Sequence, residues 1–170
     1  MSHQVELRNL SECDIDAAAD ICARAFVDSP CYVDIYFGGG DDNWRLGELK
    51  WLYATHFRAV FTKAPSALKG GYDINDALVC FFMFVPSNMP EITLWDKLCA
   101  GFFALPFRVG WGIYTRVVTT GQYFDDIVKD IIPNGECYDV LRMAVRPDCQ
   151  GRGYGSKCLG ETSLHPCEPR

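Results

Sequence analysis

Hydrophobic residues in the first third of the chain follow first a strand-like and then a helical spacing. The alternating stretch VELRNL, from Val5, predicts a first strand. Two helical stripes follow, and they consist of Ile15, Ala18, Cys22, Ala25 and Phe26 and then of Leu46, Leu49, Tyr53, Phe57 and Val60. Ser11 is expected to cap the first helix and Ser29-Pro30 to end it, and GGGDD is the turn before the second.

The next apolar stretches predict three more strands. ALKGGYD and DALVCFFMFV form a hairpin around residues 73–76, and residues 78–85 are apolar on both faces, as a covered central strand should be. In CYDVLRMAV, Leu141, Met143 and Val145 share one face while Arg142 and Ala144 share the other, and we interpret it as another central strand. The fold class is therefore α/β or α+β, a mixed central sheet flanked by helices.

Residues 90–135 separate the hairpin from the last predicted strand. Their most apolar part is LWDKLCAGFFALPFRVGWGIYTRVV, but Lys97, Arg108 and Arg116 interrupt it, and a membrane span needs about 20 apolar residues. Pro106 and the nearby glycines also weaken a continuous helix. We expect a helical hairpin packed against the domain rather than a membrane span, with peripheral membrane contact as the weaker alternative. QYFDDIVKDII predicts a further short helix that ends before Pro133.

Composition narrows the class of protein. The 170 residues predict a single domain, and 49% hydrophobic and 14% aromatic residues predict a folded one. The net charge of -6 argues against general nucleic-acid binding, although a local basic site for an anion remains open. The chain has nine cysteines, an odd number, and no CxxC pair, so we expect no disulfide framework and no metal site. We predict that they are small buried residues, Cys13, Cys22 and Cys31 included, in a cytoplasmic protein without a secretion signal.

The segment DCQGRGYGSKCL, directly after the last strand, carries the candidate chemistry. Three glycines at 151, 153 and 155 allow a tight turn, and a helix that starts there presents free N–H groups to an anion. Arg152 and Lys157 add positive charge. The segment lacks the lysine-serine pair of a P-loop, and Ser156 stands where a dinucleotide fingerprint needs its last glycine. A pyrophosphate cradle of another kind is predicted.

Residues 150–155, QGRGYG, match the pattern Q/R-x-x-G-x-G/A, and MAVRP precedes them. The combination resembles motif A of the GNAT superfamily of N-acetyltransferases, and the helical segment at 90–135 resembles an insertion in some fungal GNAT-like proteins. The resemblance implies an acetyl-CoA-dependent transfer of acetyl to a primary amine, on a small molecule or a peptide. It also implies cofactor contacts from Met143, Ala144, Val145, Gln150, Gly151, Arg152, Gly153, Tyr154, Gly155 and Ser156.

The same resemblance suggests a base. Some members carry a glutamate four residues before the triplet that corresponds to Met143-Ala144-Val145, and Asp139 stands there in this chain, as a base acting through water. Tyr32, Asp34 and Tyr36 fall in the region that lines the acceptor site in that superfamily, although loop packing explains them equally well. His56 is expected to be structural, and Cys149 to lie beside the loop without an activated thiol.

The resemblance also predicts that elements are missing. Members of the superfamily continue with a fifth strand and further elements that complete the site, whereas only 15 residues follow Gly155 here. We therefore expect an incomplete domain spanning residues 1–170, truncated after motif A, with an unpaired sheet edge and a tendency to self-associate. The alternative function is a non-catalytic CoA-binding or interaction module, and a third hypothesis is a peripheral membrane protein that uses residues 98–118.

Overall fold

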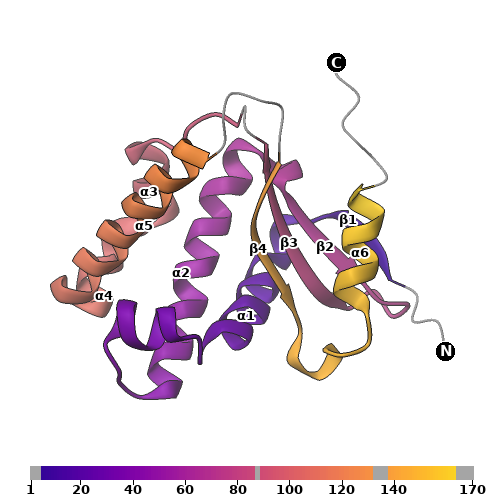
Figure 1. Cartoon of the computed structure of the whole chain (residues 1–170), viewed down its shortest axis with the longest axis horizontal. Coiled ribbons are helices and arrows are strands. Elements are labelled where there is room, and N and C mark those ends of the chain that lie inside the picture. The colour runs from indigo at the N-terminus through magenta and orange to yellow at the C-terminus, as the bar shows by residue number, and fades with distance from the viewer. Residues whose placement is uncertain (1–4, 87–88, 132–137, 164–170) are drawn as a thin grey trace.

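The computed structural model describes residues 5–86, 89–131 and 138–163. It contains one antiparallel sheet in the order β1-β2-β3-β4 (Figure 1). The strands are β1 (Glu6–Asn9), β2 (Leu68–Tyr72), β3 (Leu78–Pro86) and β4 (Tyr138–Val145). The α-helices are α1 (Ile15–Phe26), α2 (Asp42–Lys63), α3 (Leu94–Ala100), α4 (Leu105–Val109), α5 (Trp111–Ile131) and α6 (Tyr154–Ser163). Short helical turns are η1 (Glu12–Asp14), η2 (Cys31–Phe37), η3 (Pro65–Ala67), η4 (Phe102–Ala104) and η5 (Pro147–Cys149). The structure confirms the predicted fold class.

The two strands that the sequence predicts to be central differ in position. β3 pairs with β2 on one side and with β4 on the other, and its first seven residues are buried, so this prediction is confirmed. β4 pairs with β3 alone in the described part of the chain, so it lies at the edge and the prediction of a central position is wrong there. Its apolar residues predicted the strand correctly but not its burial: Ala144 is buried in the large core, whereas Val140, Leu141 and Met143 are exposed.

A large core lies between the sheet and helices α1 and α2. Phe81 of β3 packs on Phe57 of α2, with ring centroids 4.5 Å apart, and both side chains are fully buried. The helical stripes predicted from the sequence supply the other side of this core: Ile15, Ala18 and Cys22 from α1 and Leu49, Tyr53 and Val60 from α2 are buried. Ser11 precedes the 3-10 turn η1, and its hydroxyl bonds to the Asp14 carboxylate rather than to a backbone N–H as a cap would.

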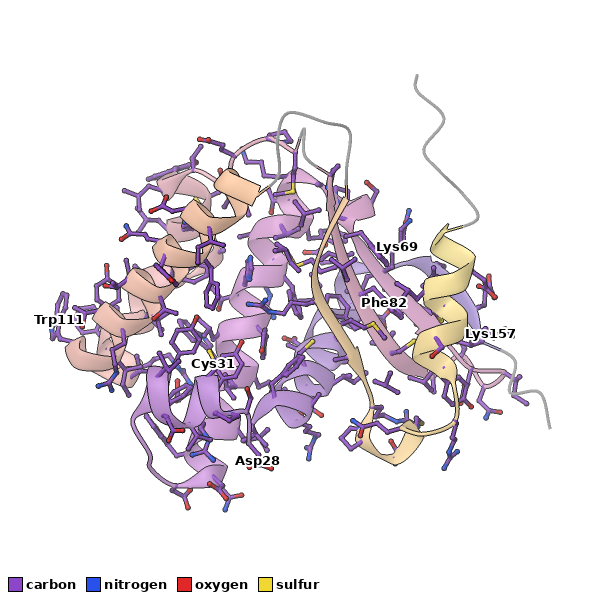
Figure 2. All side chains as sticks on the ribbon, viewed as in Figure 1. Asp28, Cys31, Lys69, Phe82, Trp111 and Lys157 are labelled. Atoms are coloured by element: carbon purple, nitrogen blue, oxygen red, sulfur yellow. The ribbon has the colours of Figure 1, made fainter. Side chains whose placement is uncertain are left out.

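A smaller core occupies the other face of the sheet, where α6 lies (Figure 1). Figure 2 shows Phe82 on the side of the sheet that α6 covers and Lys157 on α6 itself. Buried residues of this small core are Val5, Val79, Cys80, Phe82, Phe84, Cys149, Tyr154 and Cys158. The small core holds one short helix against three strands, so α6 is positioned by few side chains.

Helices α3, α4 and α5 form a layer outside α2 (Figure 1). Gly110, with a φ of +80°, ends α4, but α5 then continues through Gly121, so the separate helix predicted for QYFDDIVKDII is part of α5. A single glycine costs a helix only about 1 kcal/mol, which the other residues of a long helix offset. The outer surface of this layer carries exposed aromatic side chains, including Trp111 at its edge (Figure 2) and Phe107, which is 82% exposed.

None of the helices, in the parts of the chain described, is long and apolar enough to cross a bilayer. The cysteines divide between the interior and the surface. Cys22, Cys80, Cys149 and Cys158 are buried as predicted, but Cys13 and Cys99 are exposed and Cys31 is half-buried, which corrects the expectation for these three. The nine-residue spacing of Cys13, Cys22 and Cys31 does not match one helical face, because Cys13 lies in η1 and Cys31 opens η2.

Candidate functional site

The segment between β4 and α6 forms the turn that the sequence predicts. η5 closes with a bond from Cys149 N–H to Arg146 C=O (2.8 Å), and the Arg146 guanidinium donates to Asp148 (2.7 Å) and to Cys149 Sγ (3.2 Å). The Gln150 side-chain amide donates to Val145 C=O (3.1 Å), which fixes the start of the glycine-rich stretch against the end of β4. Cys149 is buried in the small core beside the loop, as predicted.

Two glycines in this turn have backbone conformations that favour glycine. Gly151 and Gly153 have φ values of +74° and +79°, in the left-handed region where a Cβ is unfavourable. A Cβ at either position would meet nothing within 4 Å, so their backbone faces open space. The turn therefore leaves room for a ligand to approach the main chain closely.

The third glycine serves packing instead. A Cβ on Gly155 would lie 2.8 Å from Met143 Cε and 3.1 Å from Val145 Cγ2, so this glycine lets α6 approach β4. Tyr154 and Cys158 anchor the same helix in the small core. The helix start is thereby held close to the last residues of the strand.

The start of α6 has the electrostatic features of an anion site. The first helical turn has its opening bond from Lys157 N–H to Gly153 C=O (3.0 Å), and a helix leaves its first N–H groups without intrahelical acceptors. The first turn contains no acidic residue, and Arg152, Ser156 and Lys157 are exposed. Together with the helix dipole, these groups favour a bound anion in front of the turn.

β4 presents backbone groups beside this turn. Arg146 N–H donates to Val79 C=O of β3. In an antiparallel ladder every second residue bonds to the same neighbour, so the backbone groups of Ala144 also point toward β3. The backbone N–H and C=O groups of Met143 and Val145 therefore point to the free edge. The side chains of Met143 and Val145 face α6, and that of Ala144 is buried in the large core. The structure thus brings the predicted residues of β4 and of residues 150–156 into one region.

The register of β4 shifts within the strand. Arg142 pairs with Met83 and Val140 with Phe84, which leaves Leu141 as an extra residue, a β-bulge. Asp139 lies on β4 opposite Val85, but its side chain is outside the part of the chain that the structure describes, so its role as a base stays a prediction.

The other face of β4 carries a cluster that the sequence reasoning only partly identified. Tyr32 and Tyr36 come from η2, and Tyr53 comes from α2. Tyr53 O–H donates to Tyr32 Oη (2.6 Å), and the Tyr32 and Tyr36 rings lie 5.1 Å apart. Arg142 of β4 lies close enough to all three phenols to interact with them electrostatically. Asp34, predicted with the tyrosines, is exposed instead.

Burial sets the ionisation of this cluster, here called the tyrosine-arginine cluster (Tyr32, Tyr36, Tyr53 and Arg142). Burial raises the pKa of Tyr36 to about 12 and raises that of Tyr53 further, so these two phenols stay protonated near pH 7. Burial also lowers the pKa of the neighbouring His56 to about 4, so its imidazole is neutral at pH 7 and is packed beside Phe57 as a structural residue would be.

η2 has an unusual conformation, and a residue distant in sequence holds its last residues in place. It is a π-helical segment, a rare conformation that is frequent at functional sites, and it ends at Gly38 with a φ of +67°. Arg116 of α5 donates to Tyr36 C=O (3.0 Å) and Phe37 C=O (3.5 Å), and a Cβ on Gly38 would lie 3.3 Å from this guanidinium. The third helical layer therefore fixes the end of the segment that carries Tyr32 and Tyr36.

Sequence comparisons find no match, either among protein-family models or among curated proteins. A comparison of structures does. The chain is similar to a crystal structure from Corynebacterium glutamicum described as histone acetyltransferase HPA2 and related acetyltransferase, with a TM-score of 0.61 and 14% sequence identity. The match covers 99% of this chain and 74% of that one. At this identity the similarity shows the fold: the chain has the fold of an acetyltransferase, as the resemblance in the sequence implied.

Proposed function

We propose that this protein is an acetyl-CoA-dependent N-acetyltransferase that acts on a primary amine and that residues 150–156 hold the pyrophosphate of the cosubstrate. The observation that carries the proposal is the turn from β4 to α6. It combines two left-handed glycines that face open space with a helix start free of acidic residues. The similarity in fold to a protein described as an acetyltransferase supports the same chemistry. In this reading residues 90–135 are a helical insertion in one acyltransferase domain.

The proposed reaction takes place along the free edge of β4. A ligand whose pyrophosphate lies at the turn can extend along β4, where Met143 and Val145 direct backbone groups outward. The N–H groups of this edge can hold an amide-rich arm and polarise a thioester carbonyl. Transfer requires that an acceptor amine lose a proton and attack that carbonyl, with the thiolate leaving. We assign the base to the Asp139 carboxylate, acting through a water molecule.

Calorimetric titration of acetyl-CoA tests the cradle. The wild type should bind, and Gly153→Glu should not, because its carboxylate would occupy the place of the pyrophosphate. Gly160→Glu controls for the charge: it adds the same charge to α6 at an exposed position with nothing within 4 Å of its Cβ, and should bind as the wild type does. Gly153→Ala controls for the left-handed backbone, because it adds a Cβ at the same φ of +79° without a charge. A folded wild type that does not bind acetyl-CoA would refute the proposal.

Transfer is measured separately, by mass spectrometry of a panel of primary amines incubated with protein and acetyl-CoA. Acetylated amine in the wild type, reduced at least tenfold in Asp139→Asn with unchanged acetyl-CoA binding, would support the assigned base. Binding of acetyl-CoA without transfer to any amine would instead assign the non-catalytic CoA-binding module.

A further inference from the structure

Arg142 differs from the other buried polar side chains in the described part of the chain, because one of its hydrogen-bond donors has no acceptor. Its Nε atom is buried and has no hydrogen-bond partner. One terminal nitrogen donates to the carbonyl of its neighbour Leu141 (2.7 Å), which accounts for only part of the guanidinium. A buried donor without an acceptor is unfavourable, and such a group in a folded protein calls for an explanation.

The position of Arg142 excludes a simple surface role. It shares the inner face of β4 with Ala144, which is buried in the large core, and it pairs in register with the buried Met83. No carboxylate among the described residues forms an ion pair with it, although nine other ion pairs are present in the same part of the chain. The residue as a whole is half-buried, so small solutes reach part of it.

The groups around Arg142 include three phenols, which can form hydrogen bonds. Tyr32 accepts the bond from Tyr53, which leaves the Tyr32 hydroxyl proton free to be donated. The pKa values of Tyr36 and His56 keep both groups neutral near pH 7. The cluster therefore combines one permanent positive charge with phenolic donors, a set that balances a single negative charge. A planar guanidinium edge matches a carboxylate in particular, because its N–H groups can reach both oxygens.

We propose that the tyrosine-arginine cluster binds the carboxylate of the amine that accepts the acyl group, so the substrate class is a small amine that also carries a carboxylate. As a statement about the acceptor, it rests on the proposed transferase function. Arg142 is adjacent in sequence to Met143, whose backbone groups lie at the free edge, and consecutive Cα atoms are only about 3.8 Å apart. A carboxylate held on the inner face of β4 thus leaves a short amine chain within reach of that edge. Binding at the cluster itself does not depend on acetyl-CoA.

Calorimetry with a series of probes tests the assignment. The probes are ω-amino acids of two to six carbons and, for each, the corresponding carboxamide, which has the same amine and nearly the same shape but no charge at the other end. The wild type is expected to bind at least one amino acid ten or more times more tightly than its amide. Arg142→Met, of similar length and uncharged, should lose this preference, and Arg142→Lys, which keeps the charge, should retain part of it. The absence of saturable binding by every amino acid, or a preference that survives in Arg142→Met, overturns the proposal.

Two further measurements separate the proposals. Arg142→Met should bind acetyl-CoA and melt as the wild type does, because the residue lies on the face of β4 away from the turn; if it fails to fold, Arg142→Lys carries the comparison. Carboxylate preference in a wild type that does not bind acetyl-CoA would refute the proposed function and support this inference. Acetyl-CoA binding and acetyl transfer, with no preference between each amino acid and its amide, would support the proposed function and refute this inference.

Discussion

The two cores of this molecule differ in size and in purpose. The large core joins two long helices to the sheet through bulky side chains such as Phe57 and Phe81, and it contains most of the buried hydrophobic residues of the described chain. The small core holds α6 with fewer residues: three cysteines, two valines, a tyrosine and two phenylalanines. The first makes the fold stable, whereas the second sets the position of the glycine-rich turn. Substitutions in the two cores should therefore have separable effects on stability and on ligand binding.

The largest effect is expected in the large core. Phe81→Ala should lower the free energy of unfolding by about 3–5 kcal/mol, because it removes a fully buried ring that packs on Phe57. A loss of that size is a large part of the stability of a domain of this length. Circular dichroism during thermal and urea unfolding measures it. Phe107→Ala, at an exposed position, is the matched control and should change stability by less than about 0.5 kcal/mol. Equal effects of the two substitutions would contradict the assignment of the large core.

A smaller effect is expected from overpacking the small core. A Cβ on Gly71 would lie 2.3 Å from Cys80 Sγ and 2.9 Å from Cys158 Sγ, so Gly71→Ala must displace β3 or α6. We expect a loss of about 1–3 kcal/mol and a weaker affinity for acetyl-CoA, because the displaced α6 carries the turn.

The double substitution Gly71→Ala with Cys80→Ala tests the cause. It removes the closer of the two sulfur atoms but leaves Cys158 Sγ 2.9 Å from the new methyl group, so it should restore only part of the acetyl-CoA affinity lost in Gly71→Ala. Calorimetry and chemical unfolding on the same samples measure both quantities. An affinity unaffected by Gly71→Ala would show that the small core does not position the turn.

The large core should also respond to pH through His56. Burial lowers the pKa of this imidazole from an ordinary 6.5 to about 4. Below pH 6.5 the unfolded chain takes up a proton that the folded state excludes, so the contribution of His56 to stability falls as the pH decreases from 6.5 to about 4 and changes no further below that. His56→Gln should remove this component, and the difference between wild type and variant, measured by urea unfolding across pH 4–8, should be flat above pH 7. A difference independent of pH over the whole range would refute the shifted pKa.

The smallest effect is expected at the surface of the turn. Arg152→Gln should weaken acetyl-CoA binding by less than tenfold, because the residue is exposed and its charge is screened by water and salt. The loss should shrink further as salt is raised. Arg58→Gln, on the exposed side of α2, removes the same charge far from the turn and should leave the affinity unchanged. A loss above a hundredfold would show that Arg152 is enclosed by the ligand rather than beside it.

The sequence predicted the strands and the first two helices well, because their apolar residues recur with the period of the element and face one core each. It also located the glycine-rich turn, since the conformations of Gly151 and Gly153 are local properties of the backbone. Other features depend on contacts between distant residues. The continuity of α5 through Gly121 and the contacts of Arg116 with η2 are of this kind.

The candidate site shows the same division. Tyr32 and Tyr36 were identified through a resemblance, but Tyr53 was interpreted as a core residue of a helical stripe, and Arg142 only as a residue on the other face of β4. A signal for Arg142 was available, because an arginine that alternates with Ala144 on the inner face of an apolar strand needs a partner there. Its neighbours could not be identified, because they come from segments about 90–110 residues away in sequence.

The bonds from Arg116 to the end of η2 bear on the order in which the chain acquires its structure. They join residues about 80 positions apart, so η2 cannot adopt its final conformation until α5 has formed and docked. The glycine-rich turn also depends on distant residues, because Arg146 N–H bonds to Val79 C=O and Cys158 of α6 contacts Cys80 of β3, 67 and 78 positions away. During refolding, the amide hydrogens of η2 should therefore gain protection only after α5 has docked, and pulsed hydrogen exchange measures this order.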